Sequence, residues 1–442
     1  MQYFPVMEKC RVSNKLNIKK NVITTVTAFF INILLTFVGY KLLVNHGGLE
    51  ALGLWSILSA AIFIIRIGDV GMGSSAERHV ALISIKENPK KLKNYLDTAL
   101  IINTALFSLL AMIGWLIFSN NLEWIIPGKE AFQQQAYDIL PLMFFTFVVS
   151  NIANVLTGGI RGLHLGYLSA YLSIAANVLQ LLVIIWLVPK IGITGLALGQ
   201  LAQNILTIIV AWIIIFSTLK KYIKISLFNV SFSKETFKEL FSFSLKAQAV
   251  NLINGLFEPL SKFIVGHTAG MSFLGLYELA FKIVSLPRNA VVSGVMGVMP
   301  AITRLLSQDI KQAKKLYFKT RYLVILVTGF TMLMVGLGSP IASYIMLHEV
   351  NADLILFVVT IAIGFWFNAI GAPAYTLGFS AGIMKGNLLA AILSLIILIV
   401  LSFTTKMIWP NYSAVLASAI ALAVNGLFVL WRNEKLLGVS EL

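Results

Sequence analysis

Cysteine and charged residues are both scarce in this chain of 442 residues, and each scarcity excludes a class of protein. Cys10 is the only cysteine, which excludes intrachain disulfides and cysteine-rich metal sites. Only 12% of the residues are charged, whereas 58% are hydrophobic. This balance is too apolar for a soluble domain of this size.

Sequence motifs of the common enzyme classes are missing as well. The chain contains no G-x-x-x-x-G-K-[ST], so it has no P-loop and would draw energy from an ion gradient, its substrate gradient or a partner. It contains no H-E-x-x-H, and its five histidines occur singly near the ends of apolar segments. The longest external connection, roughly residues 119–137, holds no catalytic constellation. We therefore expect neither an enzyme nor a metal protein.

Long apolar runs dominate what the sequence does contain. Each run is about 20 residues long, enough to cross the hydrocarbon layer as a helix, and too long and continuous for a barrel strand. We predict an all-α polytopic membrane protein with about twelve transmembrane helices, arranged as two six-helix lobes around a central cavity. The predicted spans are 22–44, 50–73, 97–118, 138–158, 167–188, 195–218, 243–266, 276–300, 322–347, 354–376, 386–405 and 412–431.

The longest polar connection, predicted at 219–242, divides the chain into an N-terminal lobe, 22–218, and a C-terminal lobe, 243–431. The predicted tails are 1–21 and 432–442. The first residues are polar and basic, and the first apolar run has full spanning length, so we expect no cleavable signal.

Basic residues predict how the chain lies across the membrane. The formal net charge is +16, and most of the 34 Lys and Arg residues fall in the two tails and in the even-numbered connections. By the positive-inside rule, both tails and the linker should therefore be cytoplasmic. No aromatic-interleaved reading surface accompanies these loops, so we do not expect nucleic-acid binding. The opposite side holds only Lys41, Lys129, Lys190 and Lys406.

The two predicted lobes share a short sequence pattern. "LGLW" ends at Trp55 in the first half, and "LGLY" ends at Tyr277 in the second. An arginine follows each aromatic residue at the same spacing, Arg66 in one half and Arg288 in the other. An internal repeat of this kind is typical of alternating-access transporters that bind substrate between the repeats.

The two arginines fall near the middle of their predicted spans. Arg66 and Asp69 share a helix face with Trp55, and Arg66 lies about 16 Å deeper than that indole. Arg288 lies equally deep below Tyr277 and has no acidic neighbour on its own helix. An arginine at this depth should face a wet cavity or an anionic ligand rather than lipid. We therefore expect Arg66 and Arg288 to meet there, with a structural Arg66–Asp69 pair as the alternative.

Other polar residues within the spans have two interpretations. Glu258 precedes Lys262, and Glu278 precedes Lys282, by the spacing that allows an ion pair on one helix. Glu258 is alternatively a residue that couples transport to protons or sodium, as is Asp69. Neutral side chains that suit either sugar hydroxyls or helix packing are Asn32, Thr36, Asn251 and Asn254.

Residues 52–81, "LGLWSILSAAIFIIRIGDVGMGSSAERHVA", resemble the second-helix signature of the polysaccharide and O-antigen flippases. "GGIRGLHLGY" after the fourth span and "GITGLALGQ" at the start of the sixth resemble the same family. That family belongs to the multidrug, oligosaccharidyl-lipid and polysaccharide exporter superfamily, whose fold is MATE-like. The resemblance implies two six-helix lobes around a V-shaped cavity.

The resemblance also implies a substrate and its binding residues. The substrate would be an oligosaccharide linked to polyprenyl (undecaprenyl) pyrophosphate, moved across the bacterial inner membrane. The related lipid II flippase has essential cavity arginines in its second and eighth helices, and the matching residues here are Arg66 and Arg288. Guanidinium groups bind phosphate oxygens bidentately, so we expect these arginines, with Lys262, to bind the pyrophosphate. Expected partners are this lipid-linked oligosaccharide, membrane lipids and other polysaccharide-assembly proteins.

A multidrug antiporter for organic cations is the alternative function within the same superfamily. Its cavity would be dominated by acids, and some members use carboxylates in the seventh and tenth helices. Glu258 fits the first of these positions, but span 354–376 contains no acid. We expect no cofactor beyond a possible coupling ion, H+ or Na+.

Overall fold

The computed structural model describes residues 18–66, 72–83, 85, 88–126, 130–223, 231–237, 239, 253–296, 298–380 and 384–435. Ten of its helices are long and apolar enough to cross a membrane within these residues. The N-terminal lobe comprises α1 (Ile18–Ile65), α2 (Met72–Leu82), α3 (Pro89–Ser119), α4 (Leu122–Ile125), α5 (Glu130–Gly162), α6 (Gly166–Ile191) and α7 (Ile193–Leu219). The C-terminal lobe comprises α9 (Phe257–Ala269), α10 (Met271–Met296), α11 (Met299–Gln308), α12 (Ile310–Leu347), α13 (Ala352–Ile370), α14 (Ala372–Ser380), α15 (Lys385–Thr405) and α16 (Ser413–Glu434).

The expectation of an all-α fold with about twelve spans in two lobes is confirmed. α1 supplies the first two spans, because its backbone leaves the helical conformation at Gly48, where φ is 71° and ψ is −177°. α9 is the later part of the seventh span, whose beginning at 243–252 lies outside the described residues. α13 and α14 together correspond to the tenth. The predicted tails and the linker lie largely outside the described residues, so the domain boundaries stay predictions.

A pseudo-twofold relation between the lobes is visible in their glycines. Gly48 separates the two halves of α1, and Gly270, with φ of 86°, separates α9 from α10 in the same way. Both residues have left-handed φ values, which glycine adopts without a steric penalty from Cβ. The two glycines therefore make equivalent sharp turns in the two lobes.

The lobes contact each other through equivalent surfaces of α1 and α10. A Cβ atom on Gly53 would lie 2.0 Å from the carbonyl oxygen of Met271, and one on Gly275 would lie 2.2 Å from that of Leu49. Gly53 and Gly275 are the glycines of "LGLW" and "LGLY", and the contact is reciprocal. The sequence repeat thus corresponds to a symmetric backbone contact between the two halves.

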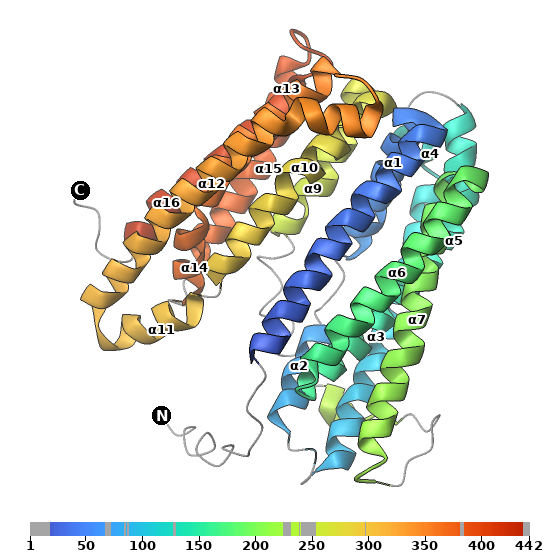
Figure 1. The fold of residues 1–442 in the computed structure, drawn as a ribbon, viewed down its shortest axis with the longest axis vertical. Helices are drawn as coiled ribbons and strands as arrows, with labels where there is room; N and C mark the ends of the chain where they lie inside the picture. The colour runs from blue at the N-terminus through green and yellow to red at the C-terminus, as the bar shows by residue number, and fades with distance from the viewer. Residues whose placement is uncertain are drawn as a thin grey trace.

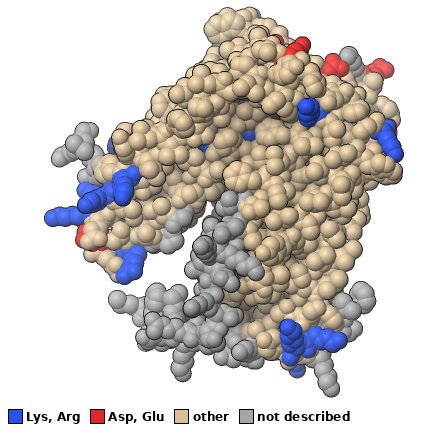
Figure 2. Space-filling view, viewed as in Figure 1, with Lys and Arg blue, Asp and Glu red and all other residues tan. Residues whose placement is uncertain are grey.

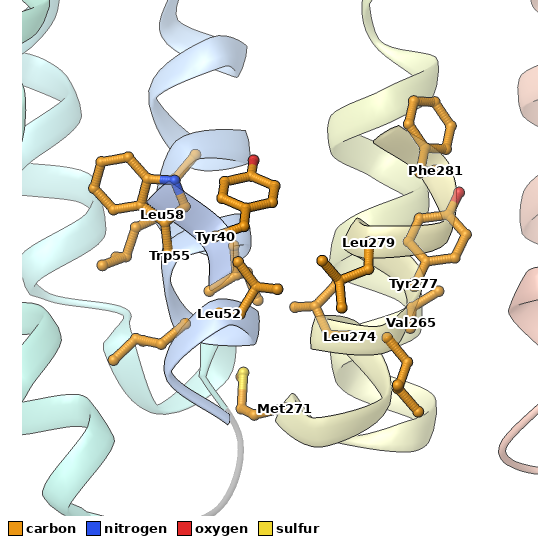
Figure 3. Packing of buried hydrophobic residues seen from close by; sticks show 14 of the residues in the cluster. Tyr40, Leu52, Trp55, Leu58, Val265, Met271, Leu274, Tyr277, Leu279 and Phe281 are labelled. Carbon is orange, nitrogen blue, oxygen red and sulfur yellow. The ribbon is translucent and has the colours of Figure 1, made fainter. Parts of the chain in front are cut away.

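Apolar side chains surround this contact. Figure 3 shows Tyr40 and Leu52 of α1 pointing toward Leu274 and Leu279 of α10, whereas Trp55 points away from α10. These residues belong to one large buried cluster that joins the two lobes, and Leu52, Leu274 and Leu279 are fully buried. The interface is therefore apolar and closely packed around the glycines.

The two bundles diverge from this interface (Figure 1), and the beginning of α1 and the end of α16 lie on the side where they are apart. Figure 2 shows a hollow between the diverging arms, with Lys and Arg side chains at the ends of the arms. Most of the Asp and Glu side chains visible in the same view lie at the opposite, joined end, which also carries some Lys or Arg side chains. The molecule is a V that opens toward its basic side.

Candidate functional site

A cavity of about 390 Å³ lies inside the C-terminal lobe, between α9, α10, α13, α14, α15 and α16. Arg288 of α10 lines it, as do Asn254 and Glu258. Lys282, about 1.7 helical turns before Arg288 on α10, lines it too. The structure thus brings three of the predicted site residues into one cavity.

Neutral groups hold Arg288 in this cavity. Its guanidinium donates hydrogen bonds to Oδ1 of Asn368 and, over 3.1 Å, to Oδ1 of Asn289. The guanidinium carbon lies 5.7 Å from the ring centre of Phe365, and Nε is buried without a hydrogen-bond partner. Arg288 forms no ion pair with any residue that the structure describes. Its charge is therefore uncompensated by a neighbouring acid.

Asn368 is itself fixed by other polar groups of the cavity. Its Nδ2 donates to the carbonyl oxygen of Leu422 and to Oδ1 of Asn425, each over 3.2 Å. Asn425 donates in turn to Ser394 over 3.4 Å. This chain of amides leaves Oδ1 of Asn368 directed at the guanidinium, so it orients Arg288 without neutralising it.

Arg66 occupies the equivalent position in the N-terminal lobe. It follows α1 directly, and its guanidinium carbon lies 5.9 Å from the ring centre of Phe147 on α5. Phe365, which faces Arg288, is on α13, the counterpart of α5 in the C-terminal lobe. The two arginines are thus related by the pseudo-twofold. Arg66 does not line the cavity around Arg288, however, and its predicted partner Asp69 lies outside the described residues.

Four charged side chains form a partly buried cluster at the lobe interface. Nζ of Lys262 lies 2.7 Å from carboxylate oxygens of both Glu258 and Glu278. Nζ of Lys282 lies 2.8 Å from Glu258 and 3.9 Å from Glu278. The predicted pairs within each helix are present, and cross-pairs between α9 and α10 join them. Because two lysines face two glutamates, the cluster balances its own charge.

This cluster buries Lys262, the lysine that we expected to bind the pyrophosphate. The Lys262 side chain is only 5% exposed, between its two glutamates, and it does not line the cavity around Arg288. The Lys282 side chain is 24% exposed and does line the cavity. Lys282 is therefore the more accessible of the two lysines, and the pyrophosphate role of Lys262 stays a prediction. The sequence could not separate them, because both are spaced for a pair with glutamate.

The N-terminal lobe contributes two hydroxyl groups to the charged cluster. Tyr40 donates a hydrogen bond of 2.6 Å to Oε1 of Glu278, and Ser56 donates one of 2.7 Å to Oε2. Both residues are on α1, and Glu278 is on α10. These bonds satisfy a carboxylate that is 1% exposed and tie the two lobes together at the apex of the V.

A second pocket of about 330 Å³ lies in the N-terminal lobe, between α1, α6 and α7. Asn32 and Thr36 line it, as predicted polar residues of the first span, and Lys282 reaches it from the other lobe. Lys282 therefore borders both cavities. Residues of this pocket that the sequence analysis missed are Gln180, Gln200 and Gln203, although glutamine within an apolar span is itself a signal. Asn251, the remaining predicted residue, lies outside the described residues.

Residues 79–345, more than half of the chain, match the model of a family described as polysaccharide biosynthesis protein. A curated protein of Shigella flexneri with the name "Putative O-antigen transporter" is 22% identical over 434 residues. The match covers 96% of this chain and 100% of that relative.

Solved structures with the same fold are transporters. An inward-facing multidrug resistance MATE family transporter of the MOP superfamily has a TM-score of 0.75 at 14% identity, over 95% of this chain and 99% of that one. An outward-facing MATE transporter of that superfamily has a TM-score of 0.68 at 16% identity, over 95% of this chain and 96% of that one. A MOP superfamily transporter from Pyrococcus furiosus has a TM-score of 0.70 at 15% identity, over 95% of both chains. At these identities the similarity shows the fold alone, and that fold is the two-lobe MATE arrangement.

Proposed function

Because the chain belongs to the polysaccharide biosynthesis protein family of MOP superfamily transporters, we propose that it flips a lipid-linked oligosaccharide across the membrane. The substrate is an oligosaccharide on polyprenyl (undecaprenyl) pyrophosphate, such as a repeat unit of O-antigen or another surface polysaccharide. The chain carries it from the cytoplasmic to the outer leaflet of the bacterial inner membrane by alternating access. The name of the Shigella flexneri relative supports this assignment.

The uncompensated charge of Arg288 is the observation that carries the proposal. A cationic side chain inside the membrane is costly, and here the neighbouring groups are amides rather than acids. A pyrophosphate offers several charged oxygens, and Nε of Arg288 is a buried donor with no partner. An anionic headgroup would supply both the missing charge and the missing acceptor.

Lys282 also lines the cavity, where Glu258 balances its charge, so the net positive charge of the lining comes from Arg288. With Arg288 and Lys282 against Glu258, the charged residues that line it favour an anion over an organic cation. The cation antiporter is therefore the weaker assignment. Glu258 remains our candidate for coupling to H+ or Na+, because its side chain is 38% exposed while it binds both lysines.

The V shape supports an inward-open state. The arms diverge on the side that carries the basic residues, which the positive-inside rule assigns to the cytoplasm together with both termini. The chain is also more similar to the inward-facing MATE transporter than to the outward-facing one. In this state the pyrophosphate would enter from the cytoplasmic leaflet, with its lipid tail in the bilayer. The product would pass to other polysaccharide-assembly proteins.

Surface-polymer display in a strain that lacks the chain tests this function. Arg288→Ala should lower display about tenfold or more, the loss expected when charge-assisted hydrogen bonds to a phosphate are removed. Arg288→Lys should restore only part of it, because an ammonium lacks the bidentate fork.

Arg432→Ala, at an exposed position near the end of α16, is the matched control and should display polymer normally. Normal display by Arg288→Ala at equal protein levels would refute the pyrophosphate role. Protection of cells from cationic dyes by the wild type would favour the antiporter instead.

A further inference from the structure

The pocket of the N-terminal lobe differs from the cavity around Arg288 in how its amides are used. In the C-terminal lobe, the side chain of Asn368 accepts a hydrogen bond from Arg288 and donates one to Asn425. In the N-terminal pocket, the side chains of Gln180, Gln200 and Asn32 make no hydrogen bond to any residue that the structure describes. Three side-chain amides from three helices thus line one pocket, and none of them is hydrogen-bonded to a described residue.

These amides suit a polar ligand. The pocket lies within the transmembrane part of α1, α6 and α7, and its amides are accessible to a ligand, since Asn32 is exposed and Gln180 and Gln200 are half-buried. Gln203 on α7 donates a hydrogen bond of 2.5 Å to Oδ1 of Asn177 on α6. It therefore links the two helices and is not a fourth amide without a partner. The remaining amides each offer donors and an acceptor, the combination that a sugar hydroxyl matches because it both donates and accepts.

The charge and shape of the pocket narrow the ligand class further. Among the described residues that line it, Lys282 alone is charged, and its ammonium is paired with Glu258 at 2.8 Å. The pocket is therefore close to neutral. Trp55 lines it with an indole that points away from α10 (Figure 3), and an aromatic face suits the apolar side of a sugar ring. A volume of about 330 Å³ lies at the small end of ligand pockets.

We propose that the pocket of Gln180, Gln200, Asn32 and Trp55 is a subsite for an uncharged sugar unit of the transported headgroup. This inference rests on the proposed function. Lys282 borders both this pocket and the cavity of Arg288, so the two sites are neighbours across one side chain. The pyrophosphate then lies in the C-terminal lobe and a sugar unit in the N-terminal lobe, and the headgroup bridges the two lobes.

Measuring the affinity for two different lipids distinguishes binding at this sugar subsite from binding at the pyrophosphate site. The probes are undecaprenyl pyrophosphate, which has no sugar, and the lipid-linked oligosaccharide that accumulates in a strain lacking this chain. Full-length protein in nanodiscs should bind the oligosaccharide lipid about tenfold more tightly, the gain expected from two additional hydrogen bonds. Gln180→Met with Gln200→Met should abolish that difference and leave the affinity for undecaprenyl pyrophosphate unchanged.

Controls keep the outcomes distinct. Asn204→Leu removes an amide from α7 that bonds within its own helix and does not line the pocket, so it should bind both lipids as the wild type does. The single variants Gln180→Met and Gln200→Met should each lose part of the difference if the double variant folds poorly.

The two proposals fail differently. If the wild type binds both lipids equally, or the glutamine variants retain the full difference, the sugar subsite is refuted and the flippase assignment stands. If the wild type binds neither lipid, the proposed function fails and this inference fails with it.

Discussion

Arg288 keeps its charge available because amides, rather than an acid, hold its guanidinium. Asn368 supplies one of these amides from α13, and Asn425 of α16 fixes the orientation of Asn368. An acid at position 368 would hold the guanidinium equally well. It would also neutralise the group that we assign to the pyrophosphate.

The substitution Asn368→Asp tests whether this neutrality matters. The two side chains have nearly the same shape, so the protein should still fold. The new ion pair with Arg288 offsets the loss of the hydrogen bonds that Nδ2 of Asn368 donates to Leu422 and Asn425, so the unfolding temperature should stay similar. Polymer display should fall about tenfold or more, because the new carboxylate pairs with Arg288 and competes with the substrate.

Asn425→Asp serves as the comparison for Asn368→Asp, because it adds the same charge one hydrogen bond further from Arg288. It should have the smaller effect on display. Equal display by Asn368→Asp and the wild type would show that a free positive charge at Arg288 is not required.

Sequence reasoning at the scale of residues succeeded where partners share a helix. Glu258 and Lys262 lie one turn apart on α9, so their ion pair followed from helical spacing alone. The contact of Lys262 with Glu278 joins two helices, and no local pattern reports how those helices are rotated. With that contact Lys262 is buried between two glutamates, whereas Lys282 lines both cavities.

At the scale of helices, the close packing of α1 against α10 depends on two glycines. Gly53→Ala and Gly275→Ala should each lower stability by about 1–3 kcal/mol, the range for side chains forced into a packed interior. The physical reason is that each new methyl group would meet a backbone carbonyl of the other helix. Thermal unfolding of the purified protein in detergent measures both losses, and their sizes should be similar because the contacts are equivalent.

Gly294→Ala on α10 is the matched control for the two interface glycines. No atom lies within 4 Å of a Cβ at that position, and its φ is not left-handed. This substitution should leave the stability unchanged or raise it slightly, by about 1 kcal/mol at most, because alanine favours the helix. A loss at Gly294 equal to that at Gly53 would mean that the helix contact is not the cause.

The apolar runs predicted nearly every helix, because twenty apolar residues leave the backbone few alternatives in a membrane. The apolar runs did not predict where a helix joins two predicted spans or extends beyond one. α1 runs through two predicted spans with a break only at Gly48, and α12 extends from Ile310, well before its predicted span at 322–347. Asp309 explains that early start, since its side chain accepts hydrogen bonds from the backbone amides of Lys311 and Gln312.

At the scale of the whole molecule, the two arms should move when substrate binds. Lys90 at the start of α3 and Lys311 at the start of α12 are exposed on the basic side, one on each arm. Spin labels at Lys90→Cys and Lys311→Cys, in a Cys10→Ser background, report the distance between the arms. Adding the lipid-linked oligosaccharide should shorten that distance, because closure of the V on its basic side is the step that alternating access requires.

A label pair within one arm is the control for that movement. Lys90→Cys and Lys220→Cys both lie in the N-terminal lobe, and their distance should stay constant if the lobe moves as a rigid body. A distance between the arms that does not respond to substrate would contradict alternating access for this chain.

The hydrogen bond between Ser56 and Glu278 has an evolutionary consequence. The two residues follow Gly53 and Gly275 at equal spacing, so each occupies the symmetry-related position of the other. In a dimer of identical halves the same residue would stand at both positions, and two glutamates would meet within hydrogen-bonding distance. Their repulsion would disfavour that assembly. The serine and glutamate pair is therefore available only to a chain whose two halves are already fused and free to diverge.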